Sequence, residues 1–301
     1  MEKYDIIVIG GGPAGLSAAI YGLRAGKKVL VLEGKALGGQ IINAPDIQNY
    51  PGVMNISGAD LSMNMYHQVE NFGGEVKFEH ATNIILDGEE KVVKTDDNEY
   101  RTNFVILATG AENRKLGLPR EQDLTGKGIS YCAICDGNFY KDKDVAVIGG
   151  GNTALEDAVY LSSLANKVYL IHRRDKFRGD DANVAKVRNC KNVELVLKAN
   201  ATELLGKKSV EGLKVKFDDE TERTLRVDGV FFAVGYVPQN AEFANLVELD
   251  ADGYVKTADG VHTNIPGIYV AGDARAKDLK QLTTAVSDGS IAATTAIKEM
   301  E

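Results

Sequence analysis

The chain has 301 residues, of which 44% are hydrophobic, so it is long enough for two globular domains of ordinary composition. Its 35 basic and 43 acidic residues give a net charge of −8, which provides no general attraction to nucleic acid or to an anionic membrane surface. Pro13 and the glycines beside it interrupt the apolar N-terminal residues, and no run reaches the ~18 to 20 apolar residues of a membrane span, so we expect neither a signal peptide nor a membrane protein.

The N-terminal residues follow the pattern strand, glycine-rich turn, helix, strand. Asp5 to Gly10 is the β-rich run D-I-I-V-I-G, and after a helix-like segment a second apolar run ends in Glu33. In a dinucleotide-binding turn, the first glycine allows the tight turn, the second lets the backbone approach a pyrophosphate and the third lets the helix pack near the strand. Gly10, Gly12 and Gly15 occupy these positions, with the phosphates expected at the helix N-terminus. A single motif of this kind is weak evidence, because many glycine-rich loops merely turn.

Strand-like runs follow the first repeat. Short ones cover residues 76–78 and 84–86, and a longer one, F-V-I-L-A-T-G, covers residues 104–110. The longer run has a counterpart in V-F-F-A-V-G, residues 230–235. We expect each of these two runs to close a nucleotide-binding sheet.

A pair of cysteines lies near the middle of the chain. Cys132 and Cys135 have the spacing that can close a small redox-active disulfide, and Asp136, which follows directly, is a candidate proton shuttle. Two structural alternatives exist for this pair: it is half of a four-cysteine zinc site, or its spacing is incidental. The sequence has no second C-x-x-C and its histidines are scattered, which argues against a metal. Cys190 is interpreted as an unpaired thiol. One such pair in a Cys-poor chain indicates redox chemistry in a reducing compartment, so a cytoplasmic location is expected.

The N-terminal pattern occurs a second time, 139 residues later. D-V-A-V-I-G covers residues 144–149, a glycine-rich turn and a helix-like stretch follow, and the run V-Y-L-I-H ends in His172. Two copies of the whole pattern argue against accidental turns and predict two dinucleotide-binding sites. The candidate residues of the second turn are Gly149, Gly151, Asn152, Thr153 and Ala154.

The residues after the second strand of each repeat distinguish the two nucleotides. Glu33 can accept hydrogen bonds from a ribose diol, as in FAD or NAD, and would repel a 2′-phosphate. His172 stands at the matching place and is followed by Arg173, Arg174 and Arg178. Guanidinium groups make bidentate contacts with phosphate, so this cluster predicts NADPH rather than a merely solvated basic loop.

These repeats predict an α/β fold in which two Rossmann-like dinucleotide-binding domains are arranged one inside the other. Polar and proline residues interrupt the pattern around 114–119 and 238–245, where we expect the chain to cross between domains. The predicted outer domain is made of residues 1–113 and 241–301, and the inner domain of residues 114–240.

A last β-rich run precedes a C-terminal helix. I-P-G-I-Y-V-A-G-D covers residues 265–273, and the helix-like stretch continues through residue 297. At the strand end, Asp273 can hydrogen-bond a polar cofactor chain or cap the following helix, and the residues alone leave both alternatives open.

Five motifs occur in a fixed order along the chain: G-G-G-P-A-G, C-A-I-C-D-G, G-G-G-N-T-A, H-R-R-D-K-F-R and I-P-G-I-Y-V-A-G-D. In this combination the sequence resembles the low-molecular-weight, bacterial-type thioredoxin reductases over essentially its whole length. The resemblance implies FAD in the outer domain, NADPH in the inner domain and a homodimer. It also implies a thioredoxin or thioredoxin-like protein as substrate, and a flavin contact for Asp273.

The resemblance also assigns individual residues. It implies that Cys135 faces the flavin, that Cys132 attacks the substrate and that Asp136 is the acid. Lys280 departs from the arginine of many relatives, which keeps the charge but loses a bidentate contact, and the stretch after Arg178 is shortened. The flavin-site residues implied by position are Gly10, Gly12, Pro13, Ala14, Gly15, Glu33, Gly39, Gln40, Asn49, Thr109, Gly110, Asp273, Lys280 and Gln281.

The implied reaction carries a hydride from NADPH to FAD, then reduces the cysteine disulfide and finally a partner disulfide through a mixed disulfide. Because nicotinamide and disulfide must each meet the flavin, the resemblance implies a rotation of the inner domain. The alternatives are a dithiol oxidase, a ferredoxin-fed reductase and a flavin-binding redox sensor without turnover. The basic cluster after the second turn argues against the first two.

Overall fold

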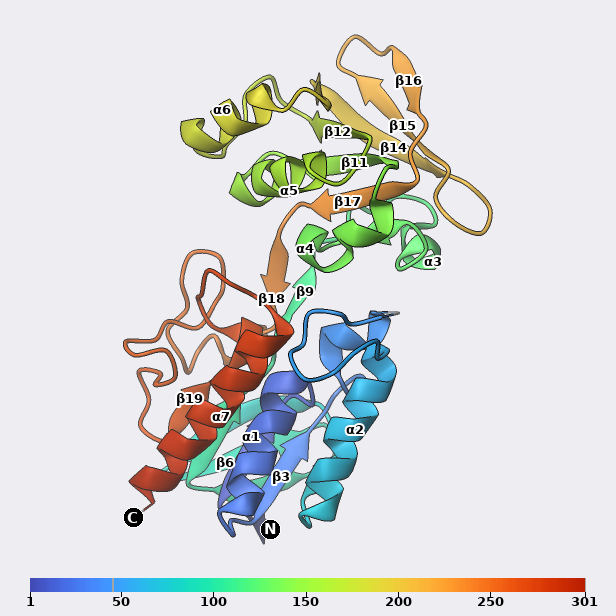
Figure 1. Ribbon diagram of the computed structural model, residues 1–301. Coiled ribbons are helices and arrows are strands. Elements are labelled where there is room, and N and C mark those ends of the chain that lie inside the picture. The colour runs from blue at the N-terminus through green and yellow to red at the C-terminus, as the bar shows by residue number, and fades with distance from the viewer. Residues whose placement is uncertain (45, 301) are drawn as a thin grey trace. The chain divides into compact units, whose positions relative to one another are not determined.

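The computed structural model describes residues 1–44 and 46–300, and the chain divides into two compact units (Figure 1). Unit 1 combines Met1–Glu112 with Val237–Glu301, and unit 2 is Asn113–Tyr236. Residues 237–240, expected in the inner domain, thus lie in unit 1. There the Asn240 amide donates hydrogen bonds to two carbonyl oxygens of unit 1, those of Gly253 and Ala274, each at 2.9 Å. The chain crosses between the units in β9 (Ala111–Asn113) and β18 (Tyr236–Pro238), which pair with each other.

Unit 1 is built on a five-stranded parallel sheet. Four of its strands are buried on both faces, as their nearly continuous apolar sequences predict, whereas the edge strand at residues 75–77, Glu-Val-Lys, is only partly buried. The run at 104–110 forms β8, which lies inside the sheet beside β2 rather than closing it, because the C-terminal segment adds β19 outside it. The strand order is β19 (Ile268–Val270), β8 (Phe104–Leu107), β2 (Ile6–Ile9), β3 (Val29–Leu32) and β4 (Glu75–Lys77).

Two layers cover this sheet. Val8 and Val31 point into a core shared with the helices α1 (Pro13–Arg24), α2 (Gly58–Asn71) and α7 (Leu282–Glu299), which lie side by side in Figure 1. Ile7 and Leu30, one residue along each strand, point into a second core with residues of a four-stranded sheet, as the period of two in a strand requires. That sheet has the order β1 (Glu2–Lys3), β7 (Glu99–Thr102), β6 (Glu90–Thr95) and β5 (Ala81–Asp87).

Short elements complete unit 1 between the sheets and the helices. They are single 3-10 turns, namely η1 (Gly39–Asn43), η3 (Ala241–Phe243) and η4 (Gly272–Ala274). All three contribute residues to the lining of the cavity described below.

Unit 2 repeats the five-stranded parallel sheet. Its order is β10 (Ile129–Ser130), β17 (Gly229–Ala233), β11 (Asp144–Gly149), β12 (Lys167–His172) and β13 (Val193–Leu197). Here too the run expected to close the sheet, β17, lies inside it, with β10 outside. The helices are α3 (Glu121–Leu124), α4 (Ala133–Asp136), α5 (Asn152–Ser162) and α6 (Asp181–Asn189), with the 3-10 turn η2 (Gly137–Tyr140).

An antiparallel sheet of β14 (Ala199–Leu205), β15 (Gly212–Phe217) and β16 (Glu222–Leu225) completes unit 2. The predicted α/β fold with two Rossmann-like parallel sheets is therefore confirmed. Among the helices formed by the described residues, none is both long and apolar enough to cross a membrane.

The end of α7 is tied to unit 1 by a small polar cluster. His262 Nε2 lies 2.7 Å from Glu299 Oε1, and its Nδ1 contacts Asp259. Tyr269 donates a hydrogen bond of 2.6 Å to the other oxygen of Glu299. Hydrogen bonds to Glu299 and Asp259 raise the pKa of His262, while those from Tyr269 and His262 lower the pKa of Glu299.

This cluster predicts a pH-dependent contribution to stability. The His262 contribution is fully present below its ordinary pKa of 6.5 and is lost as the pH rises through the higher folded value. The Glu299 contribution is present above 4.5 and is lost on acidification. We expect His262→Gln to lower the free energy of unfolding, measured by urea titration, most near pH 5.5, by less than about 1 kcal/mol because the pair is half-exposed. Near pH 8.5 the difference should shrink; an equal loss at both pH values would contradict a charge effect.

Candidate functional site

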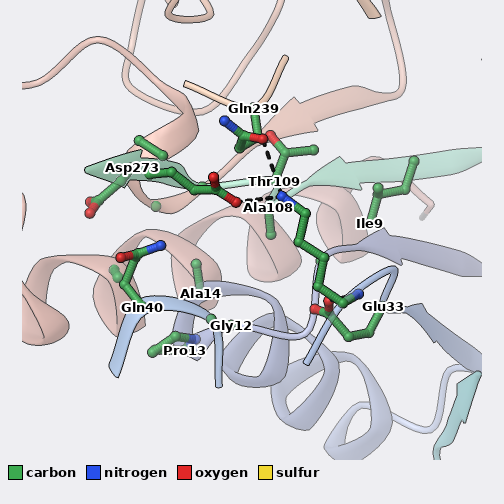
Figure 2. A pocket seen from close by; sticks show the side chains of 18 of the residues that line it. Ile9, Gly12, Pro13, Ala14, Glu33, Gln40, Ala108, Thr109, Gln239 and Asp273 are labelled. Carbon is green, nitrogen blue, oxygen red and sulfur yellow. Dashed lines mark hydrogen bonds and ion pairs between the residues drawn. The ribbon is translucent and has the colours of Figure 1, made fainter. Parts of the chain in front are cut away.

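A cavity of about 660 Å³ opens in unit 1 at the carboxyl ends of β2, β3 and β8 (Figure 2). This is the usual place for a ligand in an open parallel sheet, and the volume falls within the range of about 300 to 1,000 Å³ of cofactor pockets. Eleven of the flavin-site residues inferred from the sequence line it: Gly10, Gly12, Pro13, Ala14, Glu33, Gly39, Gln40, Thr109, Gly110, Asp273 and Gln281.

The glycine-rich turn forms one wall of this cavity. Gly10 has a φ of +110°, and a Cβ there would lie 2.3 Å from the carbonyl oxygen of Ala108. A Cβ at Gly15 would lie 1.9 Å from the carbonyl oxygen of Gly10, whereas a Cβ at Gly12 would have no atom within 4 Å. Gly12 is the N-cap of α1 and offers no capping side chain, so the first-turn amides face open space. The turn therefore fits a pyrophosphate.

Glu33 stands at the end of β3 and is buried. Its Oε2 accepts a hydrogen bond of 2.7 Å from Gly11 N, and its Oε1 accepts one of 2.6 Å from Lys35 N. These amides fix the carboxylate, and each oxygen keeps a second lone pair for a hydroxyl group. The geometry suits a ribose diol.

Asp273 lies on the opposite side of the cavity from Glu33 (Figure 2). It belongs to η4, and the N-cap of α7 is Gln281, which forms a reciprocal capping box with Thr284. The helix-capping alternative for Asp273 is therefore wrong, and its carboxylate faces the cavity. Asn49 Nδ2 donates a hydrogen bond of 3.1 Å to Gln281 Oε1 and so supports the lining from outside.

Three of the inferred flavin-site residues are not among the described residues that line the cavity. Gly15 packs against the turn, Asn49 contacts Gln281, and Lys280 lies with its Nζ 4.3 Å from the centre of the Tyr254 ring. Burial lowers the pKa of Lys280. Its ammonium donates to the carbonyl oxygen of Lys277 at 3.1 Å, a contact within its own loop.

Several lining residues could not be inferred from the motifs. Lys35 Nζ contacts Glu112 and lies 3.4 Å from Gln239 Oε1, and His80 Nε2 lies 3.4 Å from Glu242 Oε1. Each pair joins segments far apart in the chain, so no local sequence pattern reveals it. These side chains complete the cavity wall on the Glu33 side.

The second glycine-rich turn, in unit 2, makes the same close backbone approaches as the first, although Gly149, unlike Gly10, does not have a positive φ. A Cβ at Gly149 would lie 2.4 Å from the carbonyl oxygen of Ala233, and a Cβ at Gly151 would have no atom within 4 Å. Gly151 is the N-cap of α5. Asn152 holds the neighbouring loop, accepting from Asp180 N at 2.7 Å and donating to its carboxylate at 2.9 Å. Thr153 and Ala154 continue the helix.

The basic segment after β12 separates into two kinds of residue. His172 is buried: its ring stacks on Phe177 with centroids 5.4 Å apart, and a Cβ at Gly150 would lie 2.1 Å from it. Burial, assisted by the neighbouring arginines, lowers the pKa of His172, so the ring is neutral and supports the turn. The three arginines are exposed and available to a phosphate: Arg173, Arg174 and Arg178.

Cys132 and Cys135 form a disulfide at the start of α4 in unit 2. Cys132 Sγ accepts a hydrogen bond of 3.2 Å from Cys135 N, a contact that stabilises a thiolate once the disulfide is reduced. Asp136 accepts a hydrogen bond of 2.7 Å from Ser130, and burial raises the pKa of Asp136. A raised pKa makes a carboxyl group a better proton carrier near neutral pH, and Asp136 follows Cys135 directly in the chain.

Comparisons with known proteins give a consistent result. A family model described as "Pyridine nucleotide-disulphide oxidoreductase" matches residues 4–289. The chain is 41% identical over 300 residues to the thioredoxin reductase of Listeria monocytogenes, covering 99% of this chain and 94% of that protein. It is 41% identical over 292 residues to that of Bacillus subtilis, covering 96% and 92%. A solved thioredoxin reductase from Streptococcus pyogenes superposes with a TM-score of 0.94 at 39% identity, covering 99% and 98%.

Two alanine substitutions test the turn of unit 1. Gly12→Ala adds a methyl group in open space, so we expect apoprotein stability to change by no more than about 0.5 kcal/mol. Dinucleotide binding should weaken at least about tenfold, because the methyl group occupies the space of the phosphates. Gly15→Ala should instead destabilise the apoprotein by about 3 kcal/mol or more, because the new methyl group meets backbone. Thermal unfolding of the apoproteins measures the stability, and titration with FAD measures the affinity. Equal stability and equal affinity in the two variants would contradict the placement of the phosphates at Gly12.

Proposed function

The chain belongs to the pyridine nucleotide-disulphide oxidoreductase family, as a low-molecular-weight thioredoxin reductase, and on this premise we propose that FAD occupies the cavity of unit 1 and NADPH binds to unit 2. The protein is a flavoprotein oxidoreductase that reduces a thioredoxin disulfide. The Cys132–Cys135 disulfide, present in one chain with two open glycine turns, carries this conclusion.

The residues of the cavity match the parts of FAD. The open space at Gly12 accepts the pyrophosphate, Glu33 accepts hydrogen bonds from the adenosine ribose and Asp273 accepts them from the polar chain of the flavin. FMN has neither the pyrophosphate nor the adenosine, so it would leave the turn and Glu33 without ligands. The cavity lining supports FAD over FMN for this reason.

The arginines of unit 2 favour NADPH over NADH. Arg173, Arg174 and Arg178 are exposed after β12, where the 2′ position of an adenosine ribose lies in this type of fold. Arg178 N donates a hydrogen bond of 2.7 Å to Gly150 O, which ties the end of this segment to the second glycine-rich turn. NADH offers this cluster no phosphate.

Held by the Gly12 turn, Glu33 and Asp273, FAD would supply a hydride equivalent taken from NADPH, whose two electrons and one proton convert the Cys132–Cys135 disulfide into a Cys132 thiolate and a Cys135 thiol. Cys132, whose sulfur is held by the Cys135 amide, then attacks the partner disulfide as a thiolate. One partner sulfur leaves and takes a proton from Asp136, and Cys132 is left in a mixed disulfide. Cys135 gives its proton to the Asp136 carboxylate and attacks the Cys132 sulfur. The second partner sulfur leaves and takes a proton from solvent, and the original disulfide is restored.

The same premise extends to partners and assembly. We propose that the substrate is a thioredoxin or a thioredoxin-like protein, that the enzyme works as a homodimer and that it acts in the cytoplasm. The single C-x-x-C in a chain with three cysteines supports a reducing compartment. Size-exclusion chromatography with light scattering measures the assembly directly.

The nucleotide preference gives a direct test. The double variant Arg173→Ala, Arg174→Ala should lose about 1.5 to 3 kcal/mol of binding to NADPH, or roughly ten- to hundredfold in kcat/KM, because charge-assisted phosphate contacts are removed. Its kcat/KM for NADH should stay within about twofold. Arg226→Ala, an exposed arginine of the same unit after β16, serves as the matched control. An unchanged NADPH to NADH ratio in the double variant would refute the assignment of the phosphate site.

The cysteine roles can be separated by trapping. Cys132→Ser and Cys135→Ser should both abolish NADPH-dependent reduction of thioredoxin, whereas Cys190→Ser should retain it. Only Cys135→Ser should accumulate a mixed disulfide with thioredoxin, because its Cys132 still attacks and no second thiol resolves the product. Non-reducing electrophoresis and mass spectrometry detect this species. Trapping by Cys132→Ser instead would reverse the roles, and activity in both serine variants would falsify the function.

A further inference from the structure

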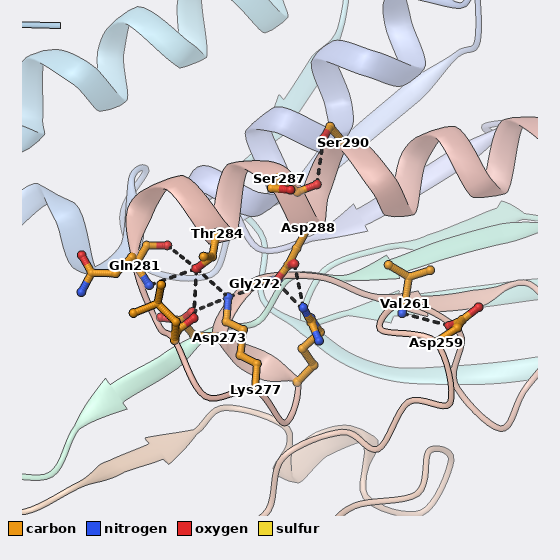
Figure 3. Close-up of polar contacts among 12 residues, drawn as sticks. Asp259, Val261, Gly272, Asp273, Lys277, Gln281, Thr284, Ser287, Asp288 and Ser290 are labelled. Atoms are coloured by element: carbon orange, nitrogen blue, oxygen red, sulfur yellow. Dashed lines mark hydrogen bonds and ion pairs between the residues drawn. The ribbon is translucent and has the colours of Figure 1, made fainter. Parts of the chain in front are cut away.

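A group of four charges, two of them buried and two partly buried, lies behind the Asp273 side of the cavity (Figure 3). It consists of Asp273, Arg275, Lys277 and Asp288, two acids and two bases. The side chains of Lys277 and Asp288 are each only 7% exposed. None of the motifs in the sequence includes Lys277 or Asp288, and the electron transfer described above does not use them.

Asp288, on α7, anchors the group. Its Oδ1 accepts a hydrogen bond of 2.9 Å from Arg275 Nη2. Its Oδ2 accepts hydrogen bonds from Arg275 Nε at 3.0 Å, Lys277 Nζ at 3.0 Å and Gly272 N at 3.2 Å. Burial opposes ionisation, but these donors prevail and lower the pKa of Asp288. With four donors around it, this carboxylate is fixed, and it fixes the ammonium group of Lys277 in turn.

Lys277 connects this anchor to the cavity. Figure 3 shows its ammonium group between Asp273 and Asp288, and Nζ lies 2.9 Å from Asp273 Oδ1 and 3.3 Å from Thr284 Oγ1. Asp273 Oδ1 is buried, and among the described residues it has no hydrogen bond of good geometry, so the Lys277 charge is what compensates its burial. A buried carboxylate oxygen without such a partner would be costly. The orientation of the whole Asp273 carboxylate thus depends on Lys277.

We propose that Lys277, held by Asp288, is a positioning residue that turns the Asp273 carboxylate toward the polar chain of the bound flavin. This inference rests on the proposed binding of FAD in the cavity. One carboxylate oxygen is retained by the lysine, and the other remains for the cofactor hydroxyl groups. Lys277 itself is not among the residues that line the cavity.

A double-mutant cycle on FAD affinity tests the proposal. Apoproteins of the wild type, Lys277→Met, Asp273→Asn and the double variant are titrated with FAD, following flavin fluorescence. We expect each single variant to bind FAD about tenfold or more weakly, and the double variant to bind no more weakly than Asp273→Asn, because Lys277 acts through Asp273. Lys298→Met, an exposed lysine near the end of α7, is the matched control and should bind as the wild type does.

Competition with ADP separates positioning from a general structural role. ADP occupies the Glu33 side only, so its affinity should be unchanged in Lys277→Met; a parallel loss of ADP and FAD affinity would overturn the proposal. If the Lys277→Met apoprotein fails to fold, the double variant Lys277→Met, Asp273→Asn, which keeps the net charge, is compared with Asp273→Asn. Weaker FAD binding by the double variant than by Asp273→Asn would also overturn the proposal. Normal FAD affinity in Lys277→Met overturns this inference alone. Normal affinity in Asp273→Asn refutes the flavin contact proposed for Asp273.

Discussion

Direct backbone contact between four segments of unit 1 is the constraint on which its cavity depends. Gly10 brings the turn against β8, Gly15 brings α1 against the turn, and a Cβ at Gly289 would lie 2.0 Å from the carbonyl oxygen of Ala14, so α7 touches α1 in the same way. A side chain at any of these positions would separate the segments by the width of a methyl group or more. Because α7 follows η4 in the chain, its contact with α1 also fixes the loop that carries Asp273.

The strand, glycine-rich turn, helix and strand pattern occurs in both units, but the residues after its second strand carry opposite charges. In unit 1 an acidic side chain, Glu33, closes the strand after the turn, and in unit 2 the corresponding place begins a cluster of arginines. The turns make similar backbone approaches, but Ala154 stands where the first turn has Gly15, and among the turn glycines only Gly10 has a positive φ. On the proposed function, specificity for one dinucleotide over the other resides in a few side chains at the strand ends and not in the backbone of the turns.

The parts that sequence analysis predicted are those in which neighbouring residues impose the geometry. Glycine turns, the buried parallel strands and the C-x-x-C pair belong to this class. The interior positions of β8 and β17 were missed because they depend on which distant segments add the outer strands, β19 and β10. Lys277 was missed because its partners also come from other segments of the chain, although the position of Asp288 in the sequence gave one indication. Asp288 shares its face of α7 with the buried Ala285, Ala292 and Ala296, and an acid in such a stripe requires a buried cation.

The discontinuity of unit 1 has a consequence for the order in which a nascent chain acquires structure. All strands of the unit 2 sheet lie within residues 129–233, so that sheet is complete well before synthesis ends. Unit 1 must wait for residues 268–299, because until they emerge β8 has an unpaired edge and α1 lacks the helix it packs on. The sheet of unit 2 can therefore form on the ribosome ahead of that of unit 1, and until β19 pairs with it β8 has an open edge that favours mispairing.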